Sequence, residues 1–89
     1  SHITDVGTLS GSDTWDPGSI AVGAMEAKDV TVTGAALGDS AIASFSLDLT
    51  DLVLNAQVTA ANTVTCVLVN NTAGAVDLGS GTIYAKIIK

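Results

Sequence analysis

The sequence predicts an all-β fold, a small antiparallel β-sandwich or jelly-roll-like barrel of about five to seven short strands. Apolar and polar residues alternate along most of the chain, with the period of two that marks a half-buried strand. Groups of turn-forming residues recur about every 8 to 12 residues, a spacing typical of sandwiches and barrels. No stretch of ordinary helix length carries apolar residues at helical spacing.

The length and composition indicate one domain with an aliphatic core. The 89 residues suit a single domain, since domains commonly run from about 50 to 200 residues. We expect residues 1–13 to form an N-terminal arm and residues 14–89 the β-sandwich domain. Hydrophobic residues make up 47% of the chain but aromatic residues only 3%. Val, Leu, Ile and Ala must therefore build the core, and they bury less area each than rings do.

The first elements are expected to be an extended segment, a turn and a strand. Residues 3–9 form a first strand or an arm, and the polar residues 10–13 are expected to end it. In the turn predicted over residues 14–19, Pro17 fixes φ at an early position and Gly18 accepts a positive φ. A strand is expected over residues 25–33.

A glycine corner then leads to the clearest alternation in the chain. Gly34 and Gly38 bracket the corner. In the strand expected over residues 41–49, one face is apolar and the other carries Ser44, Ser46 and Asp48. The apolar face is formed by Ala41, Ala43, Phe45, Leu47 and Leu49.

The C-terminal half is expected to hold a hairpin and a last strand. The apolar positions of the first hairpin strand are Leu52, Leu54, Ala56 and Val58. Residues 60–62 form its turn, in which Asn62 takes a left-handed conformation. The partner strand covers residues 63–69, residues 70–74 form another turn, and the last strand covers residues 82–88.

Two of these strands are apolar on both faces. Cys66 and Leu68 lie on one face of their strand and Val67 and Val69 on the other, and Ile87 and Ile88 are likewise opposed. Apolar residues on both faces of an antiparallel sheet indicate that both faces are covered. In so short a chain a second copy is the expected cover, so we predict a homo-oligomer.

The charge balance excludes several partners. Nine acidic residues and three lysines give a net charge of −6 at neutral pH, and arginine is absent. Without a basic surface to neutralise phosphates, nucleic acid is not an expected partner. An anionic membrane surface is disfavoured for the same reason, and no apolar run approaches the ~20 residues of a spanning helix. We expect a soluble chain.

Catalytic and metal-binding groups are sparse, so we predict no enzymatic activity, no cofactor and no metal. The single histidine is His2, and the single cysteine lies in an apolar strand that favours a buried, unreactive thiol. Paired carboxylates could act on glycosides, either Asp13 with Asp16 or Asp48 with Asp51. Aspartates in turns are better explained by hydrogen bonds to their own backbone. Asp13 and Asp16 could also bind calcium, but their spacing does not match that of an EF-hand loop.

The candidates for contact with a partner are Trp15, Asp16 and Pro17. A tryptophan ring offers a flat apolar face with a polar tip, so Trp15 could stack on a sugar ring. The interpretation that we favour is that it plugs the end of the sandwich or lies in an interface, since aromatic residues dominate the energetics of both. Both readings remain open at the level of sequence.

Four segments of the chain together carry a family resemblance. They are residues 15–21 (WDPGSIA), 30–39 (VTVTGAALGD), 58–65 (VTAANTVT) and 75–83 (AVDLGSGTI). In this order and spacing they resemble a small β module of tailed-bacteriophage virion proteins, over residues 14–89. Related modules carry more arginine in the last strand, where this chain ends in Ile87, Ile88 and Lys89. No catalytic residue is carried over.

The resemblance implies a capsid decoration or cement protein, a head fibre or a tail-fibre module, often as a trimeric β-structure. We therefore expect a non-enzymatic structural protein that forms a homotrimer on the surface of the virion. Its expected partners are further copies of itself and phage capsid or tail proteins. The alternative is a tail-fibre or surface receptor module that binds a host-surface glycan, with Trp15 as the stacking platform.

Overall fold

The computed structural model describes residues 8–49 and 51–88, and these residues form eight β-strands. The strands are β1 (Thr8–Trp15), β2 (Ser19–Ile20), β3 (Met25–Thr31), β4 (Ser40–Phe45), β5 (Val53–Ala60), β6 (Thr63–Val69), β7 (Val76–Asp77) and β8 (Gly81–Ile88). All pairs between them are antiparallel. The predicted all-β class is therefore confirmed. These described residues contain no helix long and apolar enough to cross a membrane.

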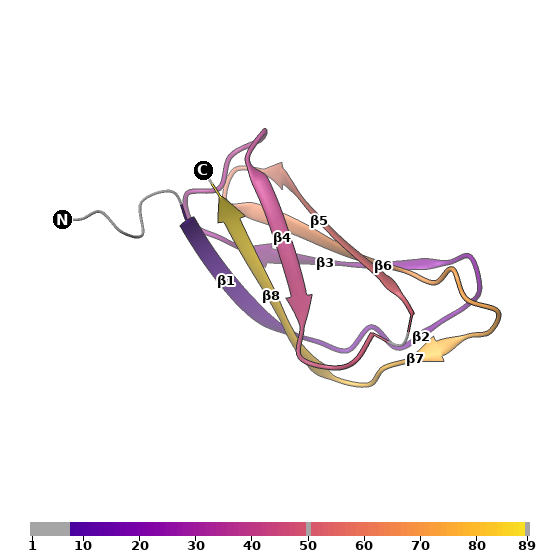
Figure 1. Ribbon diagram of the computed structural model, residues 1–89. Helices are drawn as coiled ribbons and strands as arrows, with labels where there is room; N and C mark the ends of the chain where they lie inside the picture. The colour runs from indigo at the N-terminus through magenta and orange to yellow at the C-terminus, as the bar shows by residue number, and fades with distance from the viewer. Residues whose placement is uncertain (1–7, 50, 89) are drawn as a thin grey trace.

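Two three-stranded sheets form the layers of a small β-sandwich (Figure 1). In the sheet that we call the front sheet, β8 lies between β1 and β4. In the back sheet, β6 lies between β3 and β5. The short strands β2 and β7 pair at the end of the molecule away from the C-terminus. The chain crosses between layers several times, so each layer combines segments that are distant in the sequence.

The core between the sheets is almost wholly aliphatic, as the composition predicts. The two central strands contribute its middle, because alternate residues of each point inward. The buried apolar side chains are Trp15, Ile20, Val30, Val32, Ala35, Leu52, Val58, Val64, Cys66, Leu68, Ile83, Ala85 and Ile87. The opposed pairs expected in β6 and β8 are confirmed, since Cys66 and Leu68 are fully buried and Ile88 is 44% exposed while Ile87 is buried.

The glycine corner carries the chain from the back sheet to the front sheet between β3 and β4. Gly34 and Gly38 both have φ of 95°, a backbone conformation that glycine adopts without a steric penalty. Asn62 in the hairpin turn has φ of 62°, as predicted. The side-chain Oδ1 of Asn62 accepts a hydrogen bond from the Gly34 backbone amide at 2.8 Å. The backbone amide of Asn62 donates to the Ala35 carbonyl oxygen at 2.8 Å. Asn62 thus ties the hairpin to the corner.

The first strand differs from the prediction. Residues 10–13 do not end a strand but lie inside β1, which pairs with β8 over its full length from Thr8 opposite Ile88 to Trp15 opposite Gly81. A continuous ladder with β8 outweighs the turn preference of Ser, Gly and Asp. The expected boundary between residues 13 and 14 therefore falls within a strand. Residues 3–7 of the predicted segment lie outside the described residues.

Gly11 in β1 has a packing role that the sequence did not reveal. A Cβ atom at this position would overlap the carbonyl oxygen of Thr31 at the end of β3. Glycine therefore allows the edge strands of the two sheets to approach each other.

Two strands are shorter than predicted. β4 ends at Phe45 rather than at residue 49, and β3 ends at Thr31 rather than at residue 33. After β4, the Thr82 amide donates to Ser46 Oγ at 2.8 Å, so a side chain replaces the next backbone acceptor of the ladder. Leu47 lies beyond this point and is 36% exposed, so the predicted apolar face is interrupted there.

Candidate functional site

The predicted contact residues Trp15, Asp16 and Pro17 form the end of β1 and the turn after it. Trp15 is only 7% exposed, and its ring meets the Phe45 ring edge to face with centroids 5.9 Å apart. Pro17 is buried, whereas Asp16 is exposed and its Oδ1 accepts a hydrogen bond from the Gly18 amide at 3.1 Å. The tryptophan plugs the end of the sandwich, so its ring offers no open face for stacking.

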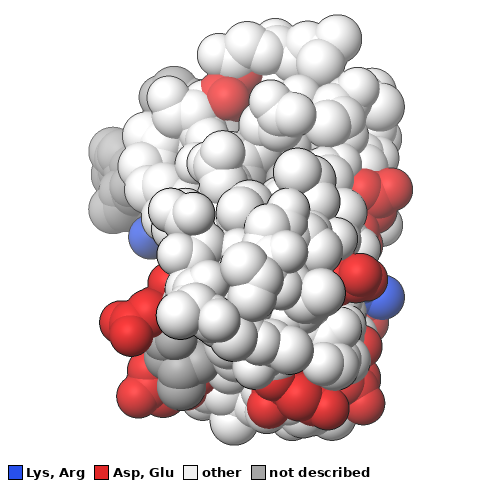
Figure 2. All heavy atoms as spheres, turned by 90° about the vertical axis from the view of Figure 1, so that its right-hand side faces the viewer, with Lys and Arg blue, Asp and Glu red and all other residues white. Residues whose placement is uncertain are grey.

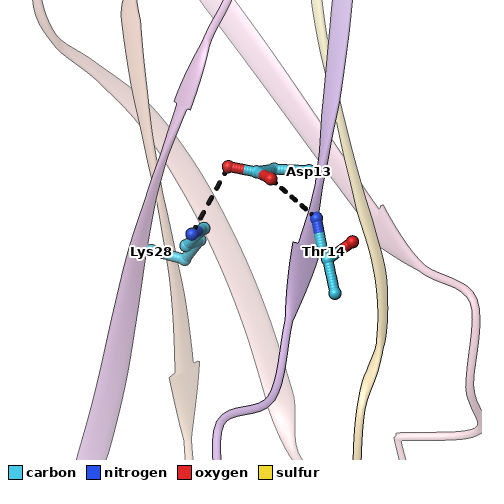
Figure 3. Close-up of polar contacts among 3 residues, drawn as sticks. All are labelled: Asp13, Thr14 and Lys28. Carbon is cyan, nitrogen blue, oxygen red and sulfur yellow. Dashed lines mark hydrogen bonds and ion pairs between the residues drawn. The ribbon is translucent and has the colours of Figure 1, made fainter.

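An ion pair joins the edge strands β1 and β3 of the two sheets. Asp13 of β1 and Lys28 of β3 point toward each other, with Lys28 Nζ 3.4 Å from Asp13 Oδ2 (Figure 3). The Thr14 amide donates to Asp13 Oδ1 at 2.8 Å. This hydrogen bond lowers the pKa of the Asp13 carboxyl, and the hydrogen bond and positive charge of Lys28 lower it further. Charged side chains that point inward at a sheet edge oppose strand pairing with other chains, so the pair is structural.

The carboxylates that the sequence raised as candidates do not assemble a metal site. Asp13 is engaged by Lys28, while Asp16, Asp48 and Asp51 are exposed. Over residues 8–49 and 51–88, no group of three or more His, Cys, Asp or Glu residues could hold a metal ion.

Cys66 lies in the core, as predicted. Burial raises the pKa of its thiol to about 11, and the nearby charge of Asp29 adds to the shift. Because the folded pKa lies above the usual value of 9.0, the protonated thiol is favoured in the folded state. The contribution of the protonated Cys66 thiol to the free energy of unfolding is complete below pH 9. This contribution is lost as the pH rises through the folded pKa of about 11.

We expect Cys66 to resist alkylation in the folded protein. At pH 8 the raised pKa lowers the thiolate fraction about 100-fold, and burial slows reagent access further. Iodoacetamide labelling followed by mass spectrometry should therefore be at least about 100-fold slower in buffer than in 8 M urea. Equal rates in the two solutions would contradict the burial of this thiol.

The outer face of the front sheet contains a hollow centred on Tyr84. Along β8, Ile83, Ala85 and Ile87 point into the core, so Tyr84 and Lys86 point outward. The hollow has a volume of about 480 Å³. We call it the tyrosine hollow, and it is lined by Ser10, Gly11, Ser12, Ile42, Ala43, Ser44, Tyr84, Ala85 and Lys86.

Strand register places small hydroxyl side chains on both sides of the tyrosine. Tyr84 lies directly between Ser12 of β1 and Ser44 of β4, while Lys86 lies between Ser10 and Ile42. Tyr84 is 48% exposed and Ile42 is 51% exposed. Serines flank the much larger tyrosine ring on both neighbouring strands, which leaves space beside it.

The hollow is unusual in its charge for so acidic a chain. The outward residues of β1, β8 and β4 include Lys86 but no aspartate or glutamate. Among the described residues, Lys86 has no ion pair, and Ser10, Ser12, Ser44 and Tyr84 form no side-chain hydrogen bonds. These polar groups are therefore free to contact a ligand.

A second surface is an apolar patch on the outer face of the back sheet. We call it the valine patch, and its members are Met25, Ala27, Val53, Val67 and Val69. Met25, Val69 and Val53 face one another across the three strands. In the next row, Val67 lies between Ala27 of β3 and the polar Asn55 of β5. Met25 is 61% exposed and Val53 is 52% exposed.

A polar row bounds the valine patch. Asp29, Thr65 and Gln57 lie side by side across the same three strands. Thr65 Oγ1 donates to Asp29 Oδ1 at 2.7 Å, so the 2.7 Å contact with Thr59 Oγ1 has Thr59 as the donor. The outer face of the back sheet therefore divides into an apolar part near β2 and a polar part beyond it.

The acidic charge is placed elsewhere on the molecule. Figure 2 looks at the end that carries the β2–β7 pair, and there acidic side chains lie along the margins while uncharged side chains cover the centre. Neither the tyrosine hollow nor the valine patch includes an acidic residue. Asp29, in the polar row that bounds the valine patch, is the acidic residue next to that patch on the same sheet face.

No protein-family model matches this chain, and no curated protein matches it.

Proposed function

We propose that this chain is a non-enzymatic structural protein of a tailed-bacteriophage virion. In this role it decorates or projects from the particle as a homotrimer, and its partners are its own copies and capsid or tail proteins. The four segments that resemble phage virion modules support the phage assignment. The valine patch is the observation that carries the proposal of self-association.

The valine patch has the properties of a surface that packs against another copy. Its side chains come from all three strands of one sheet and lie in two adjacent cross-strand rows, the second of which ends in Asn55 on β5. Cross-strand neighbours have Cβ atoms about 4.5 to 5.5 Å apart, so these side chains form one continuous surface. Completely burying an exposed Val or Met side chain contributes about 1.5 to 3 kcal/mol. Association through this patch would also enlarge an aliphatic core that contains few rings.

The proposed trimer has a direct test in a charge substitution at the centre of the patch. Val67→Asp should convert the trimer to a monomer at micromolar concentration, because association would bury an unpaired carboxylate. Sedimentation velocity gives the mass of each species. Gln57→Asp is the matched control, since it adds the same charge to the polar part of the same face and should leave the trimer intact. A monomeric wild-type protein, or a trimeric Val67→Asp variant, would contradict this assembly.

The location on a virion is tested separately by a density map of the intact particle. We expect the sandwich to fit density that projects from the capsid shell or from the tail. Absence of this chain from purified particles, as judged by mass spectrometry, would refute the location. The alternative of a glycan-binding fibre module with Trp15 as platform loses its main observation, because that ring is buried.

A further inference from the structure

We propose that the tyrosine hollow binds an acidic saccharide, with a sugar ring on Tyr84 and the carboxylate of a uronate at Lys86. The proposal goes beyond a structural role in the virion and does not depend on it.

The central ring supplies the apolar part of such a site. Tyr84 is 48% exposed on a sheet face, with small serines as its neighbours on both adjacent strands. A tyrosine combines a flat apolar face with a polar tip, and a pyranose ring likewise has an apolar C–H face and polar edges. The ring can therefore cover one face of a sugar while leaving the hydroxyls of that sugar at its rim.

The serines supply hydrogen-bonding groups at that rim. Ser12 and Ser44 lie on opposite sides of Tyr84, and Ser10 lies beside Lys86. Each serine hydroxyl is one donor and two acceptors, which matches the hydroxyls of a sugar in either direction. Because these side chains make no hydrogen bonds within the described part of the protein, no internal bond has to break on binding.

Lys86 selects for a negative charge. It lies two residues from Tyr84 on the same face of β8, about 6.6 Å along the strand. It is the one charged side chain among the outward residues of the front sheet, although the whole chain carries −6. A single lysine complements a single carboxylate, whereas a nucleic-acid strand presents a row of phosphates that several cations would have to neutralise. The charge pattern therefore favours a uronate over a nucleic acid.

The size and position of the hollow also fit an internal unit of a polysaccharide. Its volume of about 480 Å³ lies within the range of roughly 300 to 1,000 Å³ found for small-molecule sites. The hollow opens to solvent on the outer face of the sheet. It lies on the outer face of the front sheet, whereas the valine patch lies on the outer face of the back sheet. Trimers formed through that patch would leave the hollow accessible.

The test compares two oligosaccharides of equal length, one acidic and one neutral. Amide NMR titration of the full chain with galacturonic acid hexamer should shift resonances of β1, β4 and β8, and maltohexaose should bind at least tenfold more weakly. Tyr84→Ala should weaken binding of the acidic hexamer at least tenfold. Lys86→Gln should remove the preference for the acidic hexamer, and so should high salt, because screening weakens the charge interaction.

The controls show whether a variant loses hexamer binding because its binding site is removed, because it unfolds, or because the trimer dissociates. Tyr84 and Lys86 are exposed, so both variants should retain the wild-type dispersion of core amide resonances. Val22→Ala is the matched control, because Val22 is 57% exposed and lies outside the hollow. Absence of shifts at millimolar hexamer, or equal affinity for the two hexamers, would overturn the proposal. Dissociation of the trimer by Tyr84→Ala would overturn it as well, since the face would then be a contact between copies.

Discussion

Replacing Asn70 by alanine should lower the free energy of unfolding by about 3 kcal/mol or more, because each buried polar group left without a partner costs roughly 1 to 3 kcal/mol. Asn70 is completely buried, and both polar atoms of its side chain form hydrogen bonds. Its Nδ2 donates to the carbonyl oxygens of Ile20 at 2.7 Å and Gly74 at 2.9 Å. Its Oδ1 accepts from the amide of Thr72 at 2.9 Å and from the hydroxyl of the same residue at 2.6 Å.

These hydrogen bonds hold together one end of the sandwich. They join β2 to the turn after β6, and the backbone of Asn70 adds a bond to the Ala24 carbonyl at 3.0 Å and one from the Gly23 amide at 2.8 Å. The β2–β7 ladder has only two residue pairs, so it depends on this anchor. Alanine would leave a buried cavity lined by unpaired carbonyl and amide groups.

Urea denaturation of the wild type and two variants measures the effect. Asn71→Ala is the matched control, because Asn71 is exposed and surface substitutions usually change stability by no more than about 0.5 kcal/mol. Asn70→Asp keeps the acceptor for Thr72 but places a carboxylate against two carbonyl oxygens, so it should also destabilise strongly. Equal stability of the Asn70→Ala and Asn71→Ala variants would show that the anchor is unimportant.

The parts of the fold that were predictable from the sequence depend on local pattern. β6 was predicted at Thr63–Val69 and is found there, because a run of β-branched and apolar residues is bounded by a turn at each end. The left-handed Asn62 and the corner glycines were predicted for the same reason, since few residue types adopt positive φ at low cost. In these segments the conformation of each residue is determined by its own chemistry and that of its near neighbours.

The errors arise where a distant strand determines the conformation. Residues 10–13 of β1 have the composition of a turn, but pairing with β8 extends them. The role of Asn70 was missed because its partner Ile20 is 50 positions away, and an asparagine in a turn gives no signal of burial. The tyrosine hollow was missed in the same way. Alternation places Tyr84 and Lys86 on one face, but only the register of β1 and β4 shows that serines flank the ring.

Replacing Trp15 by alanine should lower the free energy of unfolding by about 3 to 5 kcal/mol, the usual cost of removing a buried Trp or Phe side chain. Trp15 is the last residue of β1, is 7% exposed, and packs its ring edge to face against Phe45 with an interplanar angle of 71°. These two rings are large members of a mainly aliphatic core. Smaller side chains nearby would have to move a long way to fill the space, so the cavity should persist.

Trp15→Phe is the matched variant, because it keeps an aromatic ring and should recover much of the lost stability. Urea denaturation followed by circular dichroism measures all three proteins without depending on the tryptophan signal. In the wild type, the fluorescence of this single tryptophan should resist acrylamide quenching and shift to longer wavelength on unfolding. A Trp15→Ala variant as stable as the wild type, with a readily quenched wild-type tryptophan, would mean that the ring faces solvent. The ring would then again be available as a stacking platform for a sugar, in competition with the tyrosine hollow.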